Sequence, residues 1–197
     1  MKKIVLLLLP VIMLSFVSAA STNIVSDTSN EYYDGSNWQN AVATWVHGSW
    51  PSISGATWIW NSLHVTDPTH PETVQFKKTF ALPACETGYT GSIKITTDNE
   101  YILKINGHSV GSDTNWQTVE TYSNIGSDLV SGSNLIEIEA KNRDCTEVSG
   151  VCDWSTNPAG VLYSADISCG NEVPEFTVIG SALALVGAVS IFLMRRK

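Results

Sequence analysis

The segment of residues 91–110, GSIKITTDNEYILKINGHSV, places the strongest constraint on the fold of this chain. Isoleucine, leucine and tyrosine recur at every second position in two stretches, 93–95 and 101–105, with mostly polar residues between them. A period of two predicts β-strands that turn one apolar row towards a core. Asn106-Gly107 then offers two residues that tolerate positive φ, as a two-residue hairpin turn requires. We therefore expect antiparallel strands organised around this hairpin.

Further strand-like segments, rich in β-branched and aromatic residues, alternate with turn signals along the chain. Leu135 to Asn142, LIEIEAKN, has the clearest alternation. In TVQFKKTFAL, Lys78 shares the phase of the apolar residues, which predicts either a bulge or a lysine that extends past apolar surface to water. About eight short strands, with no convincing amphipathic helix, favour an all-β fold, a β-sandwich of the jelly-roll type. The remaining predicted strands are residues 23–25, 57–60, 116–122 and 159–167.

The first 20 residues have the composition of a secretory signal peptide. Lys2 and Lys3 precede an apolar run that ends in Ser18-Ala19-Ala20, the small residues typical of a cleavage site. An uncleaved N-terminal anchor is the alternative. Either interpretation predicts export of the chain that follows.

The other end predicts a membrane anchor. Residues 176–194 are uncharged and apolar and are long enough to cross a hydrocarbon core of about 30 Å, and Arg195-Arg196-Lys197 follow as a cytoplasmic basic cluster. Pro174, Glu175 and Phe176 stand immediately before the apolar stretch. This order resembles the PEF-CTERM sorting signal of archaeal surface proteins over residues 172–197. The resemblance implies processing by an archaeosortase; a plain single-span anchor is the alternative. Both place the protein at the cell surface.

Between these ends, residues 21–171 are long enough for one domain with a sizeable core. The whole chain has a formal net charge of −8, and five of its 11 basic residues lie in the two terminal segments. The exported domain is therefore more acidic than the chain as a whole. Such a charge disfavours nucleic acid and anionic membrane surfaces as partners.

Four cysteines, at positions 85, 145, 152 and 169, all lie in the exported portion. An even number in an oxidising compartment predicts two disulfides. Three pairings satisfy the count. We favour Cys145–Cys152, which closes a short loop, with Cys85–Cys169, which ties an early strand end to the last strand. A zinc site is the alternative, but the cysteines lack CxxC spacing.

The order of the strand segments resembles that of galactose-binding-like domains, which are jelly-roll sandwiches found beside many glycoside hydrolases and in lectin-like modules. The resemblance extends over residues 56–168 and implies the fold, with carbohydrate as the expected ligand class. It rests on fold signatures and does not mark a sugar site, which in this family lies on variable loops. The segments that carry it are residues 56–60, 74–80 with Pro83, 98–107, 129–136 and 158–162.

Carbohydrate recognition needs flat aromatic faces for the apolar side of a sugar ring and polar side chains for its hydroxyl groups. The chain has seven tryptophans. Trp58 and Trp60 lie in a predicted strand, so we expect them in the core. The others lie in or beside predicted loops, where packing is the alternative role. The predicted carbohydrate site consists of Trp50, Trp116 and Trp154, with His108 and Asn115 as polar partners.

Asp27, Glu31 and Asp34 lie in one polar segment and offer the hard oxygen ligands that Ca²⁺ prefers. A structural calcium site is therefore a hypothesis, with a solvated acidic loop as its alternative. No nucleophile elbow, HExxH or ligand-like histidine spacing is present in the sequence. We therefore expect a non-catalytic surface protein that binds glycan. The alternative is a structural or adhesive cell-envelope component without a small ligand.

Overall fold

The computed structural model describes residues 21–145 and 151–170. Residues 20–170 form one compact unit. The predicted signal peptide and the predicted sorting segment, including Pro174, Glu175 and Phe176, lie outside the described residues. Within the two described ranges, no helix has the length and apolarity needed to cross a membrane.

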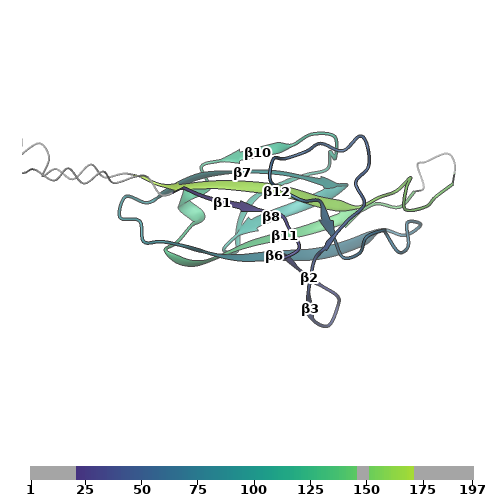
Figure 1. The fold of residues 1–197 in the computed structure, drawn as a ribbon, viewed down its shortest axis with the longest axis horizontal. Coiled ribbons are helices and arrows are strands. Elements are labelled where there is room, and N and C mark those ends of the chain that lie inside the picture. The colour runs from purple at the N-terminus through teal and green to yellow at the C-terminus, as the bar shows by residue number, and fades with distance from the viewer. Residues whose placement is uncertain (1–20, 146–150, 171–197) are drawn as a thin grey trace, which may run out of the picture. The chain divides into compact units, whose positions relative to one another are not determined.

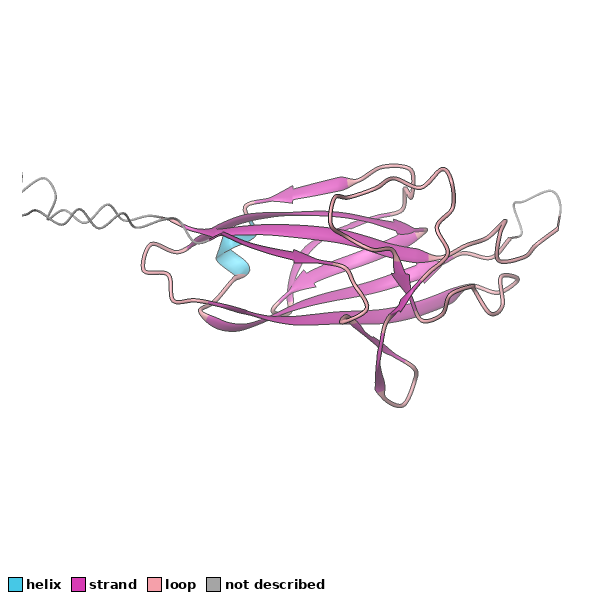
Figure 2. Ribbon diagram, in the orientation of Figure 1, coloured by secondary structure: helices cyan, strands magenta, loops and turns pink. Residues whose placement is uncertain are grey.

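In the described part of the chain, the strands form two six-stranded sheets that face each other as a sandwich (Figures 1 and 2). All strand pairs are antiparallel. The expected all-β sandwich is thus confirmed. The first sheet has the order β10 (Glu120–Ser123), β7 (Tyr89–Asp98), β12 (Gly160–Cys169), β5 (Ile59–Trp60) and β4 (Val42–Ala43), with β1 (Ser21–Val25) also paired to β12. The second has the order β3 (Trp38–Asn40), β2 (Glu31–Tyr33), β6 (Glu72–Leu82), β11 (Gly132–Asn142), β8 (Glu100–Ile105) and β9 (His108–Asp113).

The apolar rows read from the sequence form the core between the sheets. Ile93 and Ile95 of β7 are fully buried, as are Leu103 and Ile105 of β8. Trp60 is also fully buried in this core, as predicted. Trp58, at 5% exposed, is buried as well, but in a separate cluster with Trp50 and Leu162. Burial of such apolar side chains is the main stabilising contribution to a sandwich of this size.

Two features of the sheets differ from the sequence-based expectation. The polar segment after β1 contains the β2–β3 hairpin, which projects from the sandwich in Figure 1. Tyr33 and Trp38 pack across this hairpin with ring centroids 5.4 Å apart, and Lys77 Nζ lies 4.0 Å from the centroid of the Trp38 ring. The strand predicted to begin at residue 116 begins only at Glu120, because Trp116 instead packs against the Trp50, Trp58 and Leu162 cluster.

Lys78 occupies its apolar phase without a bulge, because β6 and β11 pair in continuous register with Lys78 opposite Ile136. Its Nζ donates to Asp27 Oδ1 at 2.7 Å and to Ser29 Oγ at 2.5 Å. The lysine therefore satisfies the pattern by reaching a carboxylate beyond the core.

The disulfides Cys85–Cys169 and Cys145–Cys152 confirm the favoured pairing. Cys169 ends β12 beside Ser168, and Ser168 pairs with Ser21. Both ends of the described domain therefore lie at one end of the sandwich. Asp98 and Gly160, which pair with each other, mark the opposite end.

Candidate functional site

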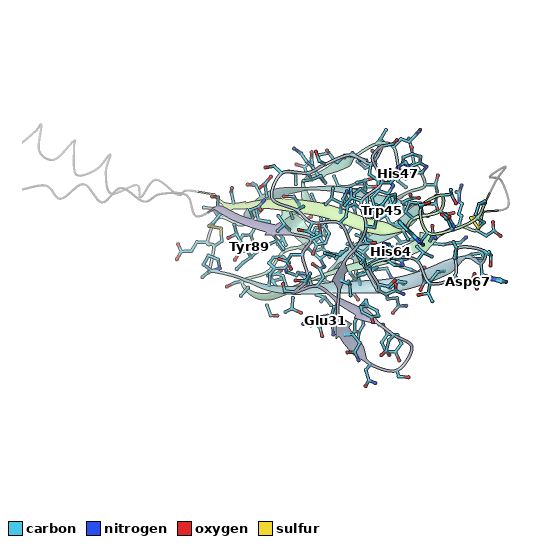
Figure 3. All side chains as sticks on the ribbon, turned by 45° about the vertical axis from the view of Figure 1, so that its right-hand side comes forward. Glu31, Trp45, His47, His64, Asp67 and Tyr89 are labelled. Carbon is cyan, nitrogen blue, oxygen red and sulfur yellow. A yellow bond between two sulfur atoms is a disulfide. The ribbon has the colours of Figure 1, made fainter. Side chains whose placement is uncertain are left out.

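A hollow of ≈ 470 Å³ lies at the end of the sandwich where β7 stops and β12 starts. Figure 3 shows His47 at the same end as Trp45 and His64, while Tyr89, which begins β7, lies towards the other end. Five stretches of chain that are far apart in sequence meet at this pocket. Its lining residues are His47, Trp50, Asp98, Asn99 and residues 114–116, 143–144 and 156–158.

Two closely packed, mutually tilted indoles form one wall of the pocket on the outer face of the first sheet. The ring centroids of Trp50 and Trp58 are 4.2 Å apart, and both rings pack with Leu162 in a small cluster separate from the main core. Gly160 provides the space for them. A Cβ at this position would lie 2.7 Å from Trp58 Cε3 and 3.2 Å from Trp50 Cη2.

Asp98, the last residue of β7, places a carboxylate in the pocket beside the Trp50 indole. It is only 6% exposed, and its Oδ2 accepts a hydrogen bond of 2.8 Å from Trp50 Nε1. Burial raises the pKa of Asp98 to about 7, although the indole bond acts in the opposite direction. The group is therefore a hydrogen-bond acceptor whose charge changes near neutral pH.

The loop between β9 and β10 brings Asn115 and Trp116 to the pocket. Thr96, which pairs with Leu162 across β7 and β12, donates through Oγ1 to the Trp116 carbonyl at 3.4 Å. Asp113 Oδ2 accepts from the Asn115 backbone N–H at 3.2 Å, and Asn115 Oδ1 accepts from the Gln117 N–H at 3.1 Å. Trp116 packs partly against the Trp50–Trp58 cluster and keeps part of its ring in solvent.

The opposite wall is a network of amides and backbone groups. Asn99 Oδ1 accepts from the Arg143 N–H at 2.7 Å, and Arg143 Nε donates to Glu100 Oε1 at 2.6 Å. Asn157 donates through Nδ2 to the carbonyls of Arg143 and Pro68, at 2.8 and 2.9 Å. This network fixes the loop after β11 against the segment before β6, so the wall is held in place before any ligand enters.

The structure brings together three of the five predicted carbohydrate residues. Asn115 and Trp116 both line the pocket. Trp50 also lines it, but one face of its ring packs on Trp58, so it serves as a buried wall and an indole donor. Trp154 lies beside the pocket in contact with Trp45 and His64. His108 begins β9 next to the hairpin turn, at the far end of the sandwich from Asp98, and does not belong to this site.

The three predicted calcium ligands do not converge. Asp27 pairs with Lys78, and Glu31 pairs with Lys77 at 3.4 Å. Asp34 accepts from the backbone N–H groups of its own turn. Among the residues that the structure describes, no group of three or more histidine, cysteine or acidic side chains is arranged to hold a metal ion. The calcium hypothesis stays a prediction, and a lower melting temperature in a chelator is the result that supports it.

Sequence reasoning did not single out Asp98, Asn99 or His47, which line the pocket. Asp98-Asn99 does have a local signal, because two polar residues interrupt the apolar rows at the corner between two strands. The burial of Asp98 has no such signal, since it depends on Trp50, which lies far away in sequence.

No known family model matches the chain, and no curated protein matches it in sequence. Solved structures with a similar fold include an FMN-binding β-glucuronidase from Facaelibacterium prausnitzii L2-6, with 16% identity and a TM-score of 0.49 over 77% of this chain and 23% of that one. A glycosyl hydrolase family 2 member from Bacteroides cellulosilyticus has 17% identity and a TM-score of 0.48 over 74% of this chain and 20% of that one. An α-L-rhamnosidase from Streptomyces avermitilis has 21% identity and a TM-score of 0.43, over 58% and 10% of the two chains. With TM-scores this low, and with less than a quarter of each of these enzymes spanned, we base no functional argument on the likenesses.

Proposed function

We propose that the protein is a non-catalytic carbohydrate-binding protein of the cell surface, and that the Asp98 pocket is its binding site. The observation that carries this proposal is a buried carboxylate, bonded to the Trp50 indole, in a hollow that also contains a second tryptophan and three asparagine amides. Sugars present hydroxyl groups around a ring whose C–H face is apolar. A pocket for them therefore needs strong acceptors and amide groups beside flat aromatic surface.

The residues of the pocket meet both needs. Asp98 accepts hydrogen bonds, and Asn99, Asn115 and Asn157 place amide groups around it. The half-buried ring of Trp116 supplies apolar surface at the rim. The volume of ≈ 470 Å³ falls in the usual range for small-molecule sites.

The proposal includes the finer features expected from the sequence. The sandwich is a galactose-binding-like jelly roll, export depends on residues 1–20, and an archaeosortase processes the tail at Pro174-Glu175-Phe176 or leaves residues 176–194 as an anchor. The two disulfides support an oxidising, extracellular location. Mass spectrometry of the mature protein from its native cells tests these features, since it defines both ends and any attached lipid.

A glycan array with the purified protein tests the binding function. Saturable binding to one sugar class is expected, and Asp98→Asn and Trp116→Ala are expected to weaken it at least about tenfold, the equivalent of about 1.4 kcal/mol. Trp38→Ala is the matched control, because Trp38 is 38% exposed but lies on the β2–β3 hairpin away from the pocket.

Two other outcomes contradict the proposal. Absence of glycan binding, together with self-association or recovery with cell-envelope material, supports the structural or adhesive role. Turnover of a bound glycan contradicts the non-catalytic part. Asp98 and Asp144 both line the pocket, and glycoside hydrolysis generally requires two carboxyl groups. The array ligands should therefore also be assayed for release of reducing sugar.

A further inference from the structure

A row of five aromatic rings leads out of the Asp98 pocket. It begins with Trp116 and His47, which line the pocket and lie 6.4 Å apart between ring centroids. His47 is 5.8 Å from Trp45, and Trp45 is 5.2 Å from Trp154. The ring of His64 then stacks on Trp154 at 4.0 Å. We refer to these five residues as the aromatic row.

Four separate loops contribute to the aromatic row, and local bonds brace three of them. The Trp45 N–H donates to the Leu63 carbonyl at 2.9 Å, which joins the Trp45–His47 segment to the His64 segment. The Trp154 loop is fixed by the Cys145–Cys152 disulfide and by Asp153, whose Oδ1 accepts from the Ser155 N–H at 2.8 Å. The rings are therefore presented by a braced surface.

The exposure of the row distinguishes it from a packing cluster. Trp154 is 38% exposed, and the neighbouring aliphatic residues Val46 and Leu63 are 52% and 54% exposed. Trp45, Trp154 and His64 belong to neither of the two buried clusters. Aromatic rings that serve only to fill a core become buried, whereas these leave apolar surface in water. The row is thus suited to cover an extended ligand with apolar faces.

We propose that the aromatic row binds the further units of an oligosaccharide chain, one unit of which occupies the Asp98 pocket. This inference rests on the proposed carbohydrate-binding function and adds that the ligand is a chain and not a single sugar. Hydrogen bonds in the pocket select one unit, and the row contributes contact area for the units beyond it. Affinity therefore increases with chain length until the row is covered.

Isothermal titration calorimetry with the full chain tests the proposal on three homologous series: glucose with its cello-oligosaccharides, glucose with its malto-oligosaccharides, and mannose with its β-linked oligosaccharides. In a series that binds, the longer members are expected to bind at least about tenfold more tightly than the monosaccharide. Trp154→Ala should remove most of this gain and leave monosaccharide affinity unchanged. Trp154→Phe, which keeps a flat ring, should retain most of it, and Trp38→Ala should have no effect. A melting curve for each variant checks that it is folded.

The outcomes separate this inference from the function on which it rests. Equal affinity for the monosaccharide and the longer members, or an unchanged gain in Trp154→Ala, overturns the role of the aromatic row while carbohydrate binding stands. Absence of binding to all three series, combined with an empty glycan array, contradicts the carbohydrate function itself, and the inference is then overturned with it.

Discussion

At the scale of single residues, the pocket depends on two positions that face each other across β7 and β12. Asp98 and Gly160 are paired in register, so a carboxylate and a residue without a side chain lie next to each other on the outer face of the sheet. The space above Gly160 admits the Trp50 and Trp58 indoles, and Trp50 in turn covers and hydrogen-bonds the Asp98 carboxylate. The absence of a side chain at Gly160 therefore allows the burial of the Asp98 carboxylate.

The charge of Asp98 predicts how stability depends on pH. Its folded-state pKa of about 7 lies above the ordinary value of 3.8, so the folded protein binds the proton more tightly than the unfolded chain does. The free energy of unfolding contributed by this group is therefore present below pH 3.8 and is lost as pH rises towards 7, by at most about 1.4 kcal/mol per pH unit. Asp98→Asn should flatten the decrease in melting temperature between pH 5 and 8.

Glu139→Gln, at an exposed position of β11, is the control for this substitution and should leave the pH dependence as it is. Hydrogen bonds hold the pKa of Asp34, Asp67 and Asp153 below the usual value, so these groups titrate below the window tested. If the melting temperatures of Asp98→Asn and of the unsubstituted protein change with pH in the same way, the raised pKa of Asp98 is contradicted.

Gly160→Ala tests the space that the indoles need. The added Cβ would meet Trp58 and Trp50 at the distances given above, and such overpacking typically costs about 1–3 kcal/mol of unfolding free energy. Denaturant unfolding followed by tryptophan fluorescence measures this loss. Gly48→Ala is the matched control, because a Cβ at Gly48 meets nothing within 4 Å. Equal stability of the two variants would show that the indoles can shift without cost.

At the scale of elements, loops from both sheets build the site, and the two disulfides act at opposite ends of the sandwich. Cys145–Cys152 lies in the loop that carries Trp154 and Asn157, whereas Cys85–Cys169 fastens the end of β12 near Gly170. We therefore expect Cys85–Cys169 to contribute mainly to the stability of the domain and Cys145–Cys152 mainly to the geometry of the pocket.

Removing each disulfide by paired serine substitutions should therefore have different effects. The sequence separations of 84 and 7 residues correspond to about 4.6 and about 2.5 kcal/mol of unfolding free energy on the chain-entropy model. Loss of Cys85–Cys169 should cost more stability and leave glycan affinity unchanged below the melting transition. Loss of Cys145–Cys152 should cost less stability but weaken glycan binding. The reverse pattern in calorimetry would be inconsistent with a site in the Cys145–Cys152 loop.

At the scale of the whole molecule, the pocket and the ends of the domain lie at opposite ends of the sandwich. Ser21 pairs with Ser168, while Asp98 pairs with Gly160 at the other end of β12. A domain attached through its last strand therefore carries the pocket on the end away from the attachment. This arrangement suits a protein that presents a binding site outward from a surface.

A domain of residues 21–170 produced alone should therefore bind glycan with the affinity of the full chain. All residues that line the pocket belong to the described domain, and the paired residues Ser21 and Ser168 lie at its other end. Side-by-side titration calorimetry of the two proteins measures the difference. An affinity that falls more than about tenfold on removal would show that the terminal segments contribute to the site.

The sequence alone determined the sandwich, because strand alternation and the Asn106-Gly107 turn are local properties of the chain. It also indicated both disulfides, since only a few pairings exist, and placed Asn115 and Trp116 in a candidate site. Only the tertiary structure showed that Trp50 buries Asp98 and that His108 lies at the far end from them. Burial of a carboxylate and the meeting of loops depend on contacts between residues far apart in sequence, which no local pattern encodes. The same holds for the aromatic row, whose rings come from four loops that only the folded sandwich brings together.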